Sequence, residues 1–343
     1  MVRGFFVVDR RDGIIAVEYT CLCETVRAQM SQKISIIVPN WNGRAFLSRC
    51  IGGLLQSAVG SGRSFELLLM DDASSDGSAE EVAKQFPDVH LITNQRNLGF
   101  GHTVNLGARK ATGDLLILVN NDLVPREHFI ENLCRHFDRN SQIFGVSGKT
   151  VDWDAATPNH VNMTARFCRG EIQLKWSDDA EAAPTMFLQG GSCAVRRDAF
   201  LEIAGFQPLY RPAYWEDYDI SYQALKMGFS NIYDPAAVGS HLGQGSMIRA
   251  YGEDSVAHFK VRNRLLFLAL NITDRQMQKE FWDALPQYVR SGSDARLKHR
   301  ARAAWYLLKN APSIRSERRL RAARQKLSDR EVFAQFADVG TLC

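Results

Sequence analysis

Residues 114–125 read DLLILVNNDLVP, a run of apolar residues that leads directly into Asn120, Asn121 and Asp122. The apolar part, Leu115–Val119, is typical of a strand whose two faces are both covered by helices, and a proline ends the pattern. Ligands of open α/β sheets bind beyond the carboxyl ends of the strands, where Asp122 would lie. Asn and Asp also favour turns, because their side chains bond to nearby backbone. This stretch alone therefore leaves two alternatives, a metal-binding carboxylate and an Asx-rich turn.

The surrounding pattern predicts an α/β domain, because short β-rich segments alternate with helical periodicity from Ile34 onward. The expected strands are 34–38, 65–70, 89–93, 115–119 and 192–195, and the expected helices are 44–57, 78–86, 102–110, 126–137, 198–203 and 216–227. Residues 150–186 have weak periodicity and are expected to form a long loop that is either functional or mobile. After Ser246 the pattern becomes mainly helical.

This organisation predicts three segments. Residues 32–246 form the α/β catalytic domain, and 247–343 form a helical, basic region. Residues 1–31 match no element of the pattern, and Met30 lies immediately before SQKISIIVPNWN. One hypothesis is therefore that translation begins at Met30 and that the preceding stretch is not native, which mass spectrometry of the native N-terminus would test.

Composition predicts a cytoplasmic protein. The chain has 343 residues, 45% hydrophobic and 23% charged, which is ordinary for a globular protein with a large core. Its seven cysteines lack paired spacing and are expected to be reduced thiols. No apolar run reaches the roughly 18 residues of a membrane span. No signal-peptide pattern occurs either, so we expect neither export nor a membrane-spanning segment.

Charge is concentrated near the C-terminus. Residues 290–330 contain thirteen Lys or Arg against three acidic residues, so this segment carries +10 in a chain of net charge +4. Such a segment either binds an anionic surface, including the inner face of the plasma membrane, or forms a solvated helical face. Nucleic-acid binding is not expected, because no motif interleaves aromatic residues with the basic ones.

Two further motifs resemble ligand sites at strand ends. In ELLLMDDASSDGS (66–78), Asp76 and Ser78 can cap the next helix, but Asp72 remains and is well placed to accept hydrogen bonds from a nucleobase or ribose. In NQRNLGFG (94–101), Gly99 and Gly101 allow a ligand to approach the backbone closely, although glycines also serve sharp turns.

Two more motifs carry candidate proton-transfer and metal-binding groups. WEDYD (215–219) opens a helix with three carboxylates, more than the helix dipole requires, and one of them could act as a general base. VGSHLGQGS (238–246) places His241 in a predicted glycine-rich turn. A single histidine is either a metal ligand or a structural hydrogen-bonding residue.

Together these segments resemble the GT-A glycosyltransferases of family 2, in particular the branch with rhamnosyl- and galactosyltransferases. The resemblance spans residues 34–246 and also rests on ISIIVPNWNG (34–43), NLGARKATGD (105–114) and LQGGSCAVRRDAFLEIAGF (188–206). It implies a Rossmann-like mixed sheet flanked by helices. The implied reaction inverts the anomeric centre as a sugar moves from a UDP-, dTDP- or GDP-sugar donor to a glycan or lipid-linked acceptor, in assembly of bacterial surface polysaccharide.

The resemblance also implies roles for individual residues. It implies that Asp217 is the catalytic base beside Glu216, and that Asp122 and His241 bind Mg²⁺ or Mn²⁺. The implied donor-nucleotide residues are Pro39, Asn40, Asn42, Asp72, Asn97, Gly99, Asn120 and Asn121, and Gly190, Gly191 and Trp215 are implied to lie near the donor sugar and acceptor. Many relatives carry Asp where this chain has Asn120.

Two other functions are alternatives. A sugar-phosphate nucleotidyltransferase can share the sheet and a metal-binding carboxylate, but VPNWNG (38–43) lacks the Gly-rich basic signature of that class. A non-catalytic glycan-binding subunit would have no need to retain Asp72, Asp122, Asp217 and His241 together.

Overall fold

The computed structural model describes residues 32–153, 158–241, 246–291 and 294–337. The predicted extension 1–31 and the turn 242–245 lie outside these residues. The strands are β1 (Ile34–Asn40), β2 (Phe65–Asp71), β3 (His90–Thr93), β4 (Leu115–Val119), β5 (Leu123–Pro125), β6 (Ile143–Asp152), β7 (Pro158–His160), β8 (Asn162–Cys168), β9 (Glu171–Ser177), β10 (Ala183–Pro184), β11 (Ser192–Arg196) and β12 (Ser230–His241).

The helices alternate with the strands first and then follow them. Their bounds are α2 (Leu47–Gly60), α3 (Ser78–Gln85), α4 (Phe100–Lys110), α5 (Phe129–Cys134), α6 (Arg197–Glu202), η1 (Pro208–Tyr210), α7 (Glu216–Lys226), α8 (Ser246–Tyr251), α9 (Glu253–Asn271), α10 (Arg275–Arg290), α11 (Asp294–Lys309), α12 (Ala311–Arg324) and α13 (Asp329–Ala334). None of the described helices is long and apolar enough to cross a bilayer.

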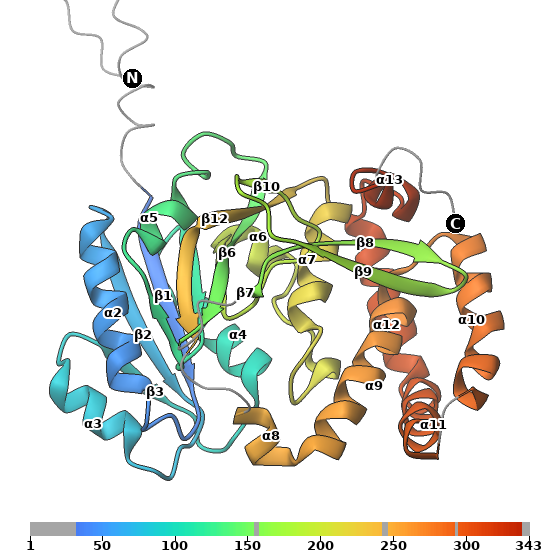
Figure 1. The fold of residues 1–343 in the computed structure, drawn as a ribbon, viewed down its shortest axis with the longest axis horizontal. Helices are drawn as coiled ribbons and strands as arrows, with labels where there is room; N and C mark the ends of the chain where they lie inside the picture. The colour runs from blue at the N-terminus through green and yellow to red at the C-terminus, as the bar shows by residue number, and fades with distance from the viewer. Residues whose placement is uncertain (1–31, 154–157, 242–245, 292–293, 338–343) are drawn as a thin grey trace, which may run out of the picture. The chain divides into compact units, whose positions relative to one another are not determined.

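A mixed sheet forms the centre of the fold (Figure 1), with its main path in the order β10-β12-β6-β11-β4-β1-β2-β3. Strands β4, β1, β2 and β3 are parallel, whereas β11 is antiparallel to both β4 and β6. The parallel strands therefore end at one edge, where Asn40 is paired with Asp71. The expected α/β fold with a C-terminal helical extension is confirmed.

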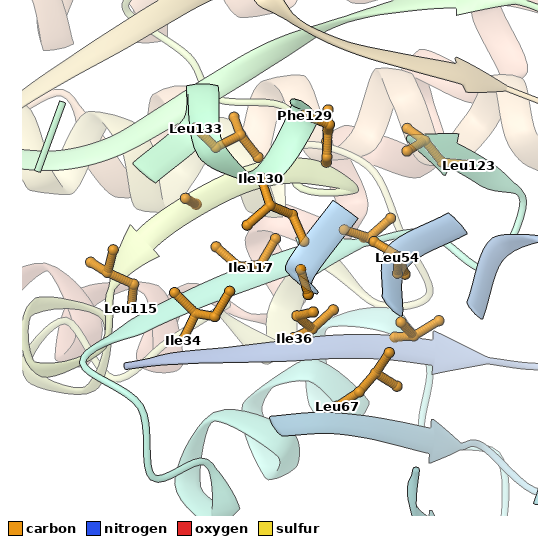
Figure 2. Packing of buried hydrophobic residues seen from close by; sticks show 14 of the residues in the cluster. Ile34, Ile36, Leu54, Leu67, Leu115, Ile117, Leu123, Phe129, Ile130 and Leu133 are labelled. Carbon is orange, nitrogen blue, oxygen red and sulfur yellow. The ribbon is translucent and has the colours of Figure 1, made fainter. Parts of the chain in front are cut away.

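Helices cover both faces of the sheet because nearly every residue of the central strands is apolar. Ile117 and its alternate neighbours pack against α2 and α5, and Figure 2 shows Ile36, Leu54 and Ile130 in this core. Leu116 belongs to the opposite core, with α4, α6 and α7. This alternation fixes the strand register, since a shift of one residue would exchange the two faces.

The C-terminal helices share a third core with the β8–β9 hairpin and helix α7. Leu266 and Phe267 of α9 pack with Tyr222 of α7 and with Met163 and Ile172 of the β8–β9 hairpin. In Figure 1 the helices α9 to α13 gather beside α7 and that hairpin. The helical region therefore supports α7, the helix that begins with the predicted catalytic carboxylates.

The expected loop at 150–186 is wrong. These residues form the end of β6, then β7, the β8–β9 hairpin and β10. The hairpin turns at Arg169 and Gly170, which both have positive φ, and its apolar residues alternate from Met163 onward. The turn residue before glycine is Arg instead of the usual Asn or Asp, so the hairpin signal is weak in the sequence.

Strand β12 is also missing from the sequence-based expectation. Pro235 and Gly239 normally argue against a strand, but β12 runs through both with a register shift between Asp234 and Val238. His241 is consequently the last residue of a strand and not part of a turn. A local irregularity accommodates the proline, which sequence periodicity does not reveal.

The predicted helix 126–137 is shorter in the structure, where α5 covers only Phe129–Cys134. Arg126, the expected first residue of the helix, instead continues the pairing of β5 with β12. Leu123–Pro125 pair with β12, and the N–H of Arg126 donates to the carbonyl of Val238. Tertiary pairing here overrides the local helical pattern.

Candidate active site

The edge formed by β1, β2 and β4 is held together by amide side chains. Asn40 is buried, its Nδ2 donates to Asp71 Oδ1 at 2.9 Å, and its Oδ1 accepts from Asn121 Nδ2 at 2.8 Å. Asn42 Oδ1 accepts from the N–H of Ser75 at 2.9 Å. These bonds fix the loops after the strands, so Asn40, Asn42 and Asn121 act first as a scaffold. Pro39 lies beside them on β1.

Asp72 organises the glycine-containing loop. It is buried, and its carboxylate accepts from the N–H groups of Leu98 and Gly99, both at 2.8 Å, and from Asn94 Nδ2 at 2.9 Å. Charge-assisted bonds of this type are stronger than neutral ones. The predicted nucleotide residues Asp72, Asn97 and Gly99 are therefore brought together by one carboxylate.

Two glycines join the end of β4 to the start of α7. The carbonyl of Gly191 accepts from the N–H of Asn120 at 3.0 Å, and the N–H of Gly190 donates to Asp217 Oδ2 at 3.1 Å. A Cβ at Gly191 would come within 2.3 Å of Asn120 Cγ, and one at Gly190 would come within 3.0 Å of Asp217 Cβ. Side chains are excluded here, which allows Asp217 to lie close to the strand end.

The carboxyls of Glu216 and Asp217 have strongly perturbed proton affinities. Burial raises the pKa of Asp217 to about 6, although the bonds from Gly190 and Tyr218 favour its charged form. Burial and the neighbouring Asp217 charge raise the pKa of Glu216 further, and its Oε2 has no hydrogen-bond partner among the described residues. Burial therefore favours the neutral form of Glu216, while Asp217, with a pKa of about 6, is ionised at pH 7 and able to accept a proton.

Asp122 and His241 form a second polar pair. Asp122 Oδ1 lies 3.2 Å from His241 Nε2, and both side chains are largely shielded from solvent. Burial alone would lower the pKa of His241, but the hydrogen bond and charge of Asp122, with the charge of Asp152, outweigh burial and raise it. Pairing of β12 with β5 brings the two residues together, with His241 opposite Leu123.

Trp215 lies in the core rather than projecting into an open cleft. It is 9% exposed, and its ring packs against Tyr218 and Phe267 at centroid distances of 4.8 and 5.3 Å. Tyr214 and Trp215 both have positive φ, which is unfavourable for aromatic residues. Backbone strain thus immediately precedes Glu216 and Asp217, as is common at functional sites.

The chain matches the family model described as "Glycosyl transferase family 2" over residues 35–204. It is a family 2 glycosyltransferase. The matched segment contains the sheet edge, the Asp72 loop and the Asn120–Asp122 turn, whereas Asp217 and His241 lie beyond it.

Similar proteins agree with this family. The chain is 23% identical over 297 residues to the N-acetylglucosaminyl-diphospho-decaprenol L-rhamnosyltransferase of Mycobacterium tuberculosis, covering 79% of this chain and 93% of that protein. Two solved structures share the fold. One is GalNAc-T7 with UDP, GalNAc and Mn²⁺ (TM-score 0.59, 16% identity, 85% of this chain and 59% of that one). The other is a mannosyltransferase of Pyrobaculum calidifontis with GDP-Man and Mn²⁺ (TM-score 0.50, 15% identity, 87% of both chains). The glycosyltransferase therefore has the GT-A fold.

The glycosyltransferase also has a pocket residue, Arg211, that its sequence motifs did not indicate. A pocket beside the Asp72 loop is lined by Gly99, His102, Arg211 and Glu216, among others. Arg211 Nη2 donates to the carbonyl of Asn97 at 3.0 Å. The sequence contains only a weak indication of this role for Arg211, because the residue lies outside every recognisable motif. It reaches the pocket only through the fold of residues 207–216.

The donor set at Asp122 and His241 fits a divalent cation that is completed by a substrate. The Asp122 carboxylate suits Mg²⁺ or Mn²⁺, and His241 Nε2 lies 3.2 Å from Asp122 Oδ1, so this nitrogen and the carboxylate could face one cation. Within the described ranges, no group of three or more His, Cys, Asp or Glu could hold a metal ion. Two protein ligands would leave the remaining positions for diphosphate oxygens and water.

Proposed function

We propose that this glycosyltransferase transfers a sugar, with inversion at the anomeric carbon, from a nucleotide-diphosphate sugar to a hydroxyl group of a lipid-linked acceptor. The observation that carries the proposal is the position of Asp217, which is held against Gly190 beside the end of β4 and has a pKa raised to about 6. A carboxylate so placed can accept a proton near neutral pH from a hydroxyl that attacks the sugar.

In the proposed reaction, the acceptor hydroxyl gives its proton to Asp217 while its oxygen forms a bond to the anomeric carbon. The bond from that carbon to the diphosphate oxygen breaks, and the electron pair leaves with the nucleoside diphosphate. Attack and departure occur on opposite faces of the sugar, so the configuration inverts.

The donor nucleotide is proposed to lie along the sheet edge, between the Asp72 loop and the turn 120–122. Asn120 would offer an amide oxygen to a ribose or sugar hydroxyl. The Asp72 carboxylate already binds Leu98 and Gly99, so its main contribution is to hold the loop that borders the base. This supports a nucleotide pocket formed largely by backbone.

Asp122 and His241 are the residues that would hold Mg²⁺ or Mn²⁺. The cation would neutralise charge on the diphosphate and stabilise the departing nucleoside diphosphate. The solved structures that share this fold contain Mn²⁺, which supports this assignment.

Metal removal tests the assignment. We expect EDTA to abolish transfer and Mn²⁺ or Mg²⁺ to restore it. Asp122→Asn should lower kcat/KM by at least roughly 100-fold, because a metal contributes several kcal/mol of charge stabilisation. Donor-dependent Mn²⁺ binding, followed by the electron paramagnetic resonance of free Mn²⁺, should weaken in parallel. Full activity in EDTA would contradict the metal role.

Activity is expected to depend on pH through Asp217. Because the raised pKa is about 6 and the base must be ionised, kcat/KM should rise with pH through about 6 and then level off. The measurement is nucleotide release between pH 5 and 8.5 at constant ionic strength and metal concentration. A kcat/KM that decreases as pH rises through about 6 would contradict the assignment of Asp217 as a base.

A lipid-linked acceptor is supported by the mycobacterial relative, an N-acetylglucosaminyl-diphospho-decaprenol L-rhamnosyltransferase. We accordingly propose that the enzyme works at the inner face of the plasma membrane in assembly of surface polysaccharide. The direct test is a donor screen that measures release of UDP, dTDP or GDP with Mn²⁺ and a prenyl-diphosphate sugar acceptor. The family match disfavours a nucleotidyltransferase, and acceptor-dependent nucleotide release would exclude a non-catalytic subunit.

A further inference from the structure

Helix α11 has an exposed face on which apolar and basic residues are separated. The residues exposed between 297 and 309 are Leu297, Lys298, Ala301, Arg302, Trp305, Leu308 and Lys309. At 100° per residue, the apolar members fall within an arc of about 80°, and the basic members form the adjoining edge. We call these seven residues the α11 face.

The apolar side chains of this face are large and open to solvent. Trp305 is 66% exposed, Leu308 is 65% exposed and Leu297 is 37% exposed. An exposed Trp beside an exposed Leu on one helix is unfavourable in water, and such patches mark surfaces that bind a partner or a membrane. The opposite side of α11 is already occupied, since Ala303 and Leu307 are buried in the core with α9.

The charged side chains of the α11 face, and of the chain on either side of it, have a single sign. No Asp or Glu occurs between residues 295 and 316, whereas this stretch contains six Lys or Arg. Lys298, Arg302 and Lys309 are exposed. A basic edge beside a Trp- and Leu-bearing stripe is the arrangement of helices that lie in the interface of an anionic bilayer, with the apolar side immersed and the cations near phosphate groups.

The inner side of the same helix touches the active-site region. Tyr306 Oη donates to the carbonyl of Leu209 at 2.8 Å, and the guanidinium of Arg262 lies over the Tyr306 ring. Asn263 of α9, which packs against α11, donates to the carbonyl of Tyr214 at 2.8 Å. Leu209 and Tyr214 belong to the segment that leads into Glu216. A surface bound by the α11 face would therefore lie near the segment that borders the pocket.

We propose that the α11 face docks the enzyme onto the surface of an anionic phospholipid bilayer. This inference deepens the proposed function and rests on it for its purpose, because a lipid-linked acceptor presents its sugar at such a surface. A nucleic acid would match the cations but would leave the apolar stripe in water. A second copy of this chain would match the apolar stripe but would bring like charges together.

The test is flotation of the full-length protein with vesicles of phosphatidylglycerol and phosphatidylcholine, compared with phosphatidylcholine alone. We expect binding to the anionic vesicles that weakens as salt rises. Trp305→Ser with Leu308→Ser should reduce the partition coefficient at least about tenfold, and charge reversal by Lys298→Glu, Arg302→Glu and Lys309→Glu should do the same.

Matched variants control for changes in overall hydrophobicity and charge. Trp176→Ser removes an exposed Trp from β9, and the set Lys84→Glu, Lys110→Glu and Arg139→Glu changes net charge by the same amount elsewhere. These variants should bind as the parent does. Circular dichroism spectra matching that of the parent would show that every variant is folded.

Several outcomes would overturn the inference. The first two are absence of binding to anionic vesicles and binding by the α11 variants that equals that of the parent. The third is binding to DNA without binding to vesicles. The fourth is a protein that binds no lipid but forms a dimer, which Trp305→Ser with Leu308→Ser dissociates. Failure of the proposed function is distinguishable. Vesicle binding without sugar transfer from any donor would support docking and overturn the proposed reaction. Transfer to a water-soluble acceptor analogue without vesicle binding would support the proposed reaction and overturn docking.

Discussion

Asp217→Asn is expected to reduce kcat by roughly 100- to 10,000-fold, the range that a general base contributes. Asparagine has nearly the same shape and can still accept the hydrogen bond from the N–H of Gly190, so the fold and the donor site should be preserved. Donor affinity, measured by calorimetry with the nucleoside diphosphate and Mn²⁺, should stay close to that of the parent. Turnover near the parent value would exclude Asp217 as the base.

Glu216→Gln is the matched control for that variant. Burial raises the pKa of Glu216 well above its usual range and so favours the neutral carboxyl, which the amide of glutamine resembles in shape and charge. We expect a much smaller loss of kcat than for Asp217→Asn. A loss as large as that of Asp217→Asn would contradict the assignment of the base to Asp217 alone, and a much larger loss would assign the proton to Glu216.

Arg321→Met is expected to lower the free energy of unfolding by about 3–5 kcal/mol, because it leaves a buried carboxylate without its cationic partner. Arg321 of α12 donates to Asp219 from Nη1 and Nη2 at 2.6 and 3.0 Å, and both residues are buried. Asn271 Nδ2 and Tyr210 Oη donate to the same carboxylate. Urea unfolding followed by circular dichroism measures the effect.

Two comparisons make this prediction specific. Arg330→Met removes an ion pair between the exposed Arg330 and Asp274 at the molecular surface and should cost no more than about 1 kcal/mol. The double variant Arg321→Met with Asp219→Leu removes both buried charges and should be more stable than the sum of the two single variants predicts. Additive losses would contradict a coupled pair. Because Asp219 lies in α7, the pair also links the C-terminal helices to the helix that carries Asp217.

The sequence predicted the strands and helices whose own residues carry a clear apolar pattern. Both ends of strand β4 were predicted correctly, since five consecutive apolar residues between polar ones are typical of a buried strand. The β8–β9 hairpin and β12 were not predicted, because an Arg–Gly turn and a proline within a strand are weak or contrary local signals. Only pairing with β6 and packing against the third core stabilise them.

The candidate site shows the same division. Asp122 and Asp217 were recognisable because carboxylates at a strand end and in a first helical turn are informative by position. The sequence did not indicate that Asp72 holds the loop 94–99, nor that Arg211 lines the adjacent pocket. Those roles depend on residues about 25 to more than 100 positions apart coming into contact, and local periodicity carries no information about such contacts.

The sequence by itself determined the alternation of strands and helices, the apolar strands and the order of the polar motifs, since each depends on side chains a few residues apart. Tertiary structure alone decided that β12 brings His241 to Asp122, that Gly190 and Gly191 let Asp217 approach the end of β4, and that burial raises the pKa of Asp217, the proposed base. Burial, sheet pairing and close backbone contact are properties of the folded chain, and they turn a set of polar residues into a site.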